Sequence, residues 1–142
     1  MGIFKTNATL ADLNALAHNT IAEQLGIQFT VLGDDRLEAT MPVDNRTRQP
    51  MGLLHGGASV TLAETLGSVA AMLCVDPKSQ YPVGLEINAN HIRGVKDGVI
   101  TGVTRPIHIG KKTQVWDIRI STEAGELVCI SRITIAILDK KV

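Results

Sequence analysis

The sequence predicts an α+β protein in which a curved antiparallel sheet folds around one long central helix. Two observations carry this prediction. Short turn segments separate the predicted strands, and connections of this length join antiparallel neighbours far more readily than parallel ones. The helix predicted over residues 58–73 has no charged stripe, so we expect other elements to cover it on several sides.

The N-terminal part predicts a helix followed by a hairpin. The helix is expected over residues 10–18, with Thr9 as its N-cap residue. Alternating apolar residues predict strands over 27–32 and 37–41. The Gly and Asp residues of segment 33–35 tolerate the backbone angles of a tight turn and are expected to join these strands.

The rest of the chain predicts the central helix and four further strands. A Gly-rich, irregular segment over residues 50–57 precedes the helix, which is rich in Ala, Leu, Val and Met. Because the connections between the last four strands are short, we expect these strands to form a four-strand meander. Their predicted ranges are residues 83–95, 99–108, 113–121 and 127–138.

Length and composition exclude several classes of protein. A chain of 142 residues suits one domain, residues 1–142, with one sizeable core. Fourteen Lys and Arg balance fourteen Asp and Glu, which argues against a nucleic-acid partner. Cys74 and Cys129 lie far apart without Cys-x-x-Cys spacing, so we expect a cytoplasmic protein without a disulfide framework. The longest weakly charged run, residues 52–75, carries Glu64 at its centre, so no membrane span is expected.

Glu64 is the most informative residue of the central helix. An ionised carboxylate in apolar surroundings is costly unless it is paired or hydrogen-bonded, and residues 52–75 contain no Lys or Arg. We therefore expect Glu64 to meet another element, a second subunit, or water in a cleft. Thr61, Glu64 and Ser68 share one stripe of the helix. Two interpretations stay open: a core acid held in a structural network, and a catalytic carboxylate.

The segment His55-Gly56-Gly57 stands where the central helix is expected to begin. The free N–H groups of a first helical turn attract negative charge, and glycine lets a ligand approach the backbone closely. A carbonyl oxygen held at Gly56 or Gly57 would be polarised, an effect worth on the order of a hundred- to a thousandfold in rate per donor. The sequence thus places an electrophilic stabiliser and a carboxylate on adjacent pieces of chain.

Other polar residues carry weaker signals. Ser59 lacks the final glycine of a nucleophile elbow, so we assign it a structural role. The four histidines show no metal-ligand spacing, so no metal is expected. Lys111 and Lys112, with Arg105 and His108, form the densest basic stretch, which a phosphate-bearing ligand could use.

Residues 55–64, His-Gly-Gly-Ala-Ser-Val-Thr-Leu-Ala-Glu, resemble the hotdog-fold acyl-CoA thioesterases. More narrowly, the chain is similar to the bacterial aryl-type branch that includes dihydroxynaphthoyl-CoA thioesterase and the proofreading thioesterase of enterobactin synthesis. The likeness runs over residues 10–138. Further matching segments are residues 37–44, 49–54, 84–91, 114–116 and 131–132.

The resemblance implies a hotdog fold, dimers or dimers of dimers, and active sites at the subunit interface. By position, Glu64 would be the nucleophile or the general base that activates water, and Gly56 would supply the backbone N–H to the thioester carbonyl. His55, Gln49 and Ser68 would orient carbonyl, thiol or water. The residues that would hold the coenzyme A arm are Gly84, His91, Arg93, His108, Gly110, Lys111, Lys112 and Thr113.

The function implied by the resemblance is hydrolysis of an acyl-CoA thioester with an aromatic acyl group. Dihydroxynaphthoyl-CoA, in menaquinone or phylloquinone synthesis, ranks first, and carrier-bound dihydroxybenzoyl groups rank second. No cofactor is expected; coenzyme A enters the reaction only as part of the substrate. The alternatives are an acyl hydratase or dehydratase of the same fold, and a non-catalytic module that binds acyl-CoA.

Overall fold

The fold is described by a computed structural model, which covers residues 2–141. Three helices and six strands follow one another along the chain. In order, they are α1 (Leu10–Ala15), α2 (Ile21–Gln24), β1 (Gln28–Leu32), β2 (Leu37–Pro42), α3 (Gly56–Leu73), β3 (Gln80–His91), β4 (Val99–Ile109), β5 (Thr113–Thr122) and β6 (Leu127–Asp139).

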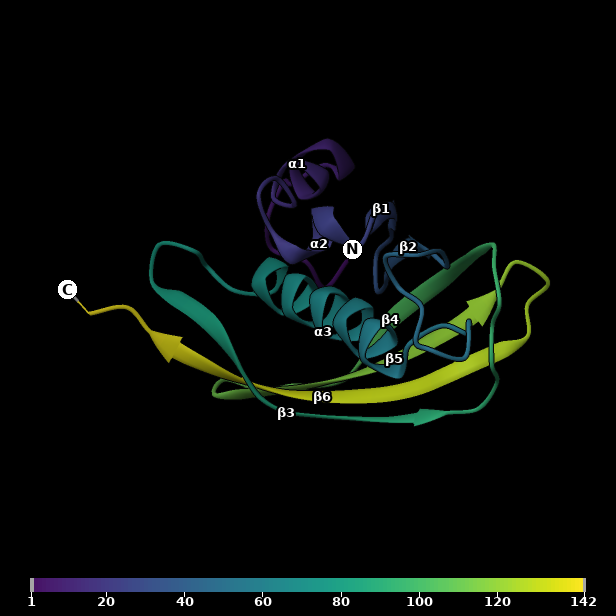
Figure 1. Ribbon diagram of the computed structural model, residues 1–142. Coiled ribbons are helices and arrows are strands. Elements are labelled where there is room, and N and C mark those ends of the chain that lie inside the picture. The colour runs from purple at the N-terminus through teal and green to yellow at the C-terminus, as the bar shows by residue number, and fades with distance from the viewer. Residues whose placement is uncertain (1, 142) are drawn as a thin grey trace.

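All six strands form one antiparallel sheet in the order β1-β2-β4-β5-β6-β3. The sheet curves beneath α3, which lies across its concave face, while α1 and α2 lie on the other side of α3 (Figure 1). The predicted architecture, a curved antiparallel sheet around one long helix, is therefore confirmed.

The predicted four-strand meander is wrong in its first strand. β4, β5 and β6 do follow one another as neighbours, but β3 pairs with the far side of β6 and β4 pairs with β2. The connection over residues 92–98 therefore crosses the width of three strand spacings, roughly 14 Å. Residues 92–95 were expected in the strand and residues 97–98 in a tight turn, but the whole segment carries the chain from one edge of the sheet into its interior.

The N-terminal helix is shorter than predicted and a second helix follows it. Thr9 caps α1 as expected: its hydroxyl accepts from Asp12 N–H at 3.2 Å, and the Asp12 carboxylate accepts from Thr9 N–H at 2.8 Å. Asn19 then adopts a positive φ of 60°, which ends the helical run. Thr20 starts the unpredicted α2 by capping Ala22 N–H.

α3 begins at Gly56, two residues before its predicted start, and β3 covers residues 80–91 rather than 83–95. The predicted bounds of β4, β5 and β6 hold to within one residue. Along residues 2–141, no helix is both long and apolar enough to cross a membrane.

The core forms where small residues of α3 allow the sheet to approach closely. A Cβ on Gly67 would come within 2.5 Å of Ile133 Cγ2, and a Cβ on Gly102 of β4 would come within 2.6 Å of Leu66 Cδ1. A larger residue at either position would therefore force Ile133 or Leu66 to shift. The buried residues of α3 are Ala58, Ser59, Leu62, Ala63, Leu66, Gly67, Ala70, Ala71 and Leu73.

We predict that Gly67→Ala lowers stability even though alanine favours helices. Overpacking against Ile133 costs about 1–3 kcal/mol, and the gain in helix propensity returns about 1 kcal/mol. A net loss near 1 kcal/mol corresponds to a fall of roughly 3 °C in the midpoint of thermal unfolding, measured by circular dichroism. An unchanged or raised midpoint would contradict close packing at this position.

Candidate active site

The N-terminus of α3 leaves one amide hydrogen free. His55 is the N-cap residue, and its Nδ1 accepts from Gly57 N–H at 2.8 Å. The N–H groups of Ala58 and Ser59 donate to His55 O at 3.0 and 3.3 Å. Within residues 2–141, the Gly56 N–H is the one amide of this first turn without an acceptor. It lies at the positive end of the helix dipole, where it can donate to an incoming oxygen.

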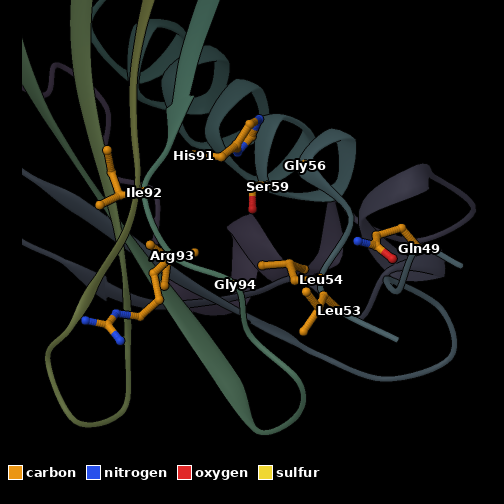
Figure 2. A pocket seen from close by; sticks show the side chains of 10 residues that line it. Gln49, Leu53, Leu54, Gly56, Ser59, His91, Ile92, Arg93 and Gly94 are labelled. Carbon is orange, nitrogen blue, oxygen red and sulfur yellow. The ribbon is translucent and has the colours of Figure 1, made fainter. Parts of the chain in front are cut away.

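This amide borders a cavity of about 290 Å³, here called the Gly56 cavity. The His91 imidazole lies against Gly56, because a Cβ there would come within 2.8 Å of His91 Nε2. Gln49 Oε1 accepts from Met51 N–H, so its amide NH₂ remains available to donate. The lining residues, which come from four segments of the chain (Figure 2), are Gln49, Leu53, Leu54, Gly56, Ser59, His91, Ile92, Arg93, Gly94 and Val128.

Glu64 lies exposed on α3, beside the edge strand β3 of the sheet. No hydrogen bond or ion pair joins its carboxylate to any described residue of the chain. A Cβ on Gly84 of β3 would come within 3.4 Å of Glu64 Oε2, so glycine leaves room for the carboxylate. The interpretation of Glu64 as a core acid in a structural network is therefore wrong.

Glu64 and Ser68 line a second cavity of about 300 Å³, here called the Glu64 cavity. Most of its wall is apolar and comes from α1, α2, β1 and α3. Thr20 and Thr65 donate their hydroxyls to backbone carbonyls, whereas no described residue bonds the Ser68 hydroxyl. The lining residues are Leu13, Leu16, Ala17, Thr20, Ile21, Ala22, Phe29, Glu64, Thr65, Ser68 and Val69.

A single chain does not bring Gly56 and Glu64 into one cavity. The two residues are eight positions apart on α3, which corresponds to about 12 Å along the helix axis. Each opens into its own cavity. Gln49, His91 and Arg93 accompany Gly56, while Ser68 accompanies Glu64, so the predicted site residues form two groups.

The basic turn predicted to hold coenzyme A lies at the opposite end of α3. Gly110 N–H donates to Thr113 O at 2.9 Å, which closes the tight turn between β4 and β5. Gly110 and Lys111 line a third cavity of about 350 Å³, together with Lys5 and with Cys74, the C-cap residue of α3. Within one chain the turn is therefore about 25 Å from Gly56, the length of α3.

The two cysteines are poor candidates for a nucleophile. Both thiols are buried and unpaired. Burial raises the pKa of Cys74 to about 11 and also raises the pKa of Cys129, so neither forms a thiolate readily near neutral pH. In the described part of the chain, no group of three or more His, Cys, Asp or Glu is arranged to hold a metal ion.

Sequence reasoning missed one polar residue of the Gly56 cavity. Ser59, assigned a structural role, is only 1% exposed and lines this cavity. A signal was present, because Ser59 follows Gly56 by three residues and residues at that spacing share a face of a helix. The apolar walls that α1 and α2 contribute to the Glu64 cavity were also missed, because no local sequence pattern indicates that these helices pack beside Glu64.

Comparison with known proteins identifies the family. The thioesterase superfamily model matches residues 51–129. The chain is 55% identical over 136 residues to the 1,4-dihydroxy-2-naphthoyl-CoA hydrolase of Escherichia coli, covering 96% of this chain and 99% of that protein. It is 52% identical over 136 residues to the proofreading thioesterase EntH of Cronobacter turicensis, covering 96% and 98% of the two chains.

Solved structures agree with this result. The fold superimposes on a crystal structure of a mutant thioesterase from Pseudomonas aeruginosa with a TM-score of 0.96 and 51% identity, covering 98% of this chain and all 100% of that one. A thioesterase from Haemophilus influenzae gives a TM-score of 0.94 and 48% identity, covering 96% and 95%. The free amide at the start of α3 and the unpaired carboxylate two turns along it thus lie in a hotdog-fold enzyme, and the chain belongs to the thioesterase superfamily.

Proposed function

We propose that this enzyme hydrolyses an aromatic acyl-CoA thioester, with dihydroxynaphthoyl-CoA as the first-ranked substrate and carrier-bound dihydroxybenzoyl groups as the second. The single observation that carries the proposal is the pair formed by a free Gly56 N–H and an unpaired Glu64 carboxylate. The ranking of substrates rests on the names of the relatives from Escherichia coli and Cronobacter turicensis. The first-ranked substrate would place the enzyme in menaquinone synthesis.

The acyl group occupies the Glu64 cavity in this proposal. Its wall is largely apolar, with side chains such as Leu13, Phe29 and Val69, and it contains no Lys or Arg. Burial of a ring against such a wall is favourable by about 25 cal/mol for each Å² of apolar surface removed from water. Glu64 and the Ser68 hydroxyl stand in the same cavity, where they can reach the reacting carbon and a polar substituent.

The complete site requires two copies of the chain. Because Gly56 and Glu64 open into different cavities, the amide of one copy must meet Glu64 of the partner subunit. β3 offers the surface for this association: it is a 12-residue edge strand, and its Leu85 is 62% exposed. A long apolar edge strand tends to pair with another chain. A two-fold antiparallel pair would bring the His91 end of each β3 toward the Gly84 end of the other.

The same arrangement unites the two groups of coenzyme A residues. His91 and Arg93 lie near Gly56 at one end of the protomer, and the turn over residues 108–113 lies at the other end. An antiparallel dimer places the turn of the partner subunit near Arg93. Gly84, His91, Arg93, His108, Gly110, Lys111, Lys112 and Thr113 can then bind one coenzyme A arm across the interface.

Hydrolysis follows from these positions. Glu64 either attacks the thioester carbon or removes a proton from the attacking water, and the carbonyl oxygen gains negative charge beside the Gly56 N–H. The carbon–sulfur bond then breaks and the thiolate leaves without a strong acid. Gln49, His55 and Ser68 orient carbonyl, thiol or water. If Glu64 is the nucleophile, water then cleaves the acyl-enzyme anhydride.

The proposed enzyme needs no cofactor and works in the cytoplasm. All chemical steps use side chains, backbone and water, so no metal or cofactor is required. We place this single-domain enzyme in the cytoplasm, because both of its cysteines are unpaired thiols.

Glu64→Gln tests the carboxylate. The amide neither attacks the thioester nor accepts a proton, so we expect kcat for benzoyl-CoA and dihydroxynaphthoyl-CoA to fall at least about a thousandfold. The midpoint of thermal unfolding should stay within roughly 1 °C, because Glu64 has no partner within the described chain. Release of the free thiol is measured by absorbance with a chromogenic disulfide reagent.

Three results, from this variant and from separate assays of hydration and binding, would contradict the proposal. Near-full hydrolysis by Glu64→Gln would remove the carboxylate from the mechanism. Robust hydration of crotonyl-CoA by the wild-type enzyme would favour the hydratase alternative. Saturable binding of acyl-CoA without thiol release would favour a non-catalytic module.

Gly56→Pro tests the amide hydrogen. Proline is accepted at the first helical position, and the φ of −69° and ψ of 129° at His55 suit a residue before proline. The variant therefore keeps α3 but loses the donor, and kcat should fall about a hundred- to a thousandfold. Gly56→Ala is the matched control, since it also meets His91 but keeps the N–H. Equal losses in both variants would show that contact with His91, not the donor, is responsible.

Mixing the two inactive variants tests whether the site is shared. A heterodimer of Glu64→Gln and Gly56→Pro chains contains one intact site if Gly56 and Glu64 come from different subunits. Random reassociation of equal amounts should then restore roughly a quarter of wild-type activity, since half of the dimers are mixed and half of their sites are intact. No recovery, with mixed dimers verified by mass spectrometry, would show that each site uses one chain.

A further inference from the structure

The Ser59 hydroxyl is available for a ligand. Ser59 is 1% exposed, and in Figure 2 its oxygen points away from α3 into the space bordered by Leu54 and Gly94. Two other hydroxyls of the helix are engaged: Thr61 donates to Gly57 O at 2.9 Å and Thr65 donates to Thr61 O at 2.7 Å. Among residues 2–141, none forms a hydrogen bond with the Ser59 hydroxyl. Ser59 lines the Gly56 cavity, and its oxygen is not among the fully buried side-chain atoms that lack a partner.

The polar groups of the Gly56 cavity suit a neutral, hydrogen-bonding chain. Its walls are partly apolar, through residues such as Leu53 and Val128, and no carboxylate lines it. The one permanent cation of the lining, Arg93, is paired with Glu126 at 3.1 Å and is half-exposed at the rim. The cavity therefore offers little uncompensated positive charge to bind an anion. A neutral chain that contains an amide can instead pack its carbon atoms on the apolar wall and hydrogen-bond the Ser59 hydroxyl, which can donate or accept.

The position of Ser59 relative to Gly56 fits the spacing of such an amide from the thioester. Ser59 follows Gly56 by three residues, which is about 4.5 Å along the helix axis. In a coenzyme A thioester, a two-carbon link joins the sulfur to the nearest amide of the pantetheine arm, a comparable length. With the acyl group in the apolar Glu64 cavity, the sulfur side of the substrate is the part left for the Gly56 cavity.

We propose that the Ser59 hydroxyl hydrogen-bonds the pantetheine amide nearest the thioester sulfur, so that the Gly56 cavity binds the thiol side of the substrate. This inference rests on the proposed thioesterase function and adds a binding residue to it. Ser59 thereby recognises any substrate with a pantetheine arm, whether the arm is attached to coenzyme A or to a carrier protein, and makes no contact with the acyl group.

Three benzoyl thioesters test the inference. Benzoyl-CoA and benzoyl-N-acetylcysteamine both contain the amide, whereas S-ethyl thiobenzoate lacks it. For Ser59→Ala we expect kcat/KM to fall about tenfold with the first two substrates, because a buried amide loses its partner, and to change less than about twofold with the third. Ser59→Cys, with a weak S–H donor in nearly the same volume, should give a smaller fall with the same pattern.

Controls separate this role from a structural one. Ser79→Ala removes an exposed serine hydroxyl away from both cavities and should leave all three rates unchanged. Equal losses with all three substrates, or a large fall in the thermal midpoint, would assign Ser59 a structural role and overturn the inference. Unchanged kcat/KM for benzoyl-CoA in Ser59→Ala would also overturn it. If the wild-type enzyme hydrolyses none of the thioesters, the proposed function itself fails.

Discussion

The close packing of α3 on the curved sheet is the constraint from which the site follows. Leu62 and Leu66 are fully buried, and Gly67 and Gly102 let the helix and the sheet approach until no space remains for a Cβ. This contact fixes the rotation of the helix about its axis. Because the apolar face packs on the sheet, Glu64 stays exposed beside the edge strand β3, and the sequence of one helix decides which groups remain open to a substrate.

Some polar groups at the start and along the sides of α3 form hydrogen bonds within the helix or its cap, and others have no hydrogen-bond partner in the described chain. His55 Nδ1 and His55 O satisfy three amides of the first turn, and two threonine hydroxyls bond carbonyls one turn back. The remaining groups are the Gly56 N–H, the Ser59 hydroxyl, the Glu64 carboxylate and the Ser68 hydroxyl. A buried or half-buried polar group without a partner is costly, so a bound substrate can offset this cost at Gly56, Ser59 and Ser68, while the exposed Glu64 carboxylate stays free to react.

The division of the candidate site between two cavities is the reason that the proposed mechanism needs two copies of the chain. A donor at the end of α3 and a carboxylate two turns along it cannot converge on one carbonyl within a rigid helix. In the proposed dimer, a two-fold axis would set the end of one helix against the middle of the other without distorting either helix. The nearly neutral surface, with equal numbers of acidic and basic residues, does not oppose such contact between identical chains.

The amino-acid sequence by itself determined the central helix, the capped start of α1 and most strand bounds, because these depend on local periodicity, capping and turn residues. It also pointed to Glu64 and to the glycine-rich start of α3, since a lone carboxylate in an apolar run and glycines before a helix are local signals. Strand order could not be read in the same way: residues 97–98 look like a tight turn between neighbouring strands, and only the pairing of β3 with β6 shows that residues 92–98 cross the sheet. Three features were decided by tertiary structure alone: the position of Ser59 in the wall of the Gly56 cavity, the walls that α1 and α2 give to the Glu64 cavity, and the separation of Gly56 from Glu64. Each depends on which surfaces pack together across distant parts of the chain.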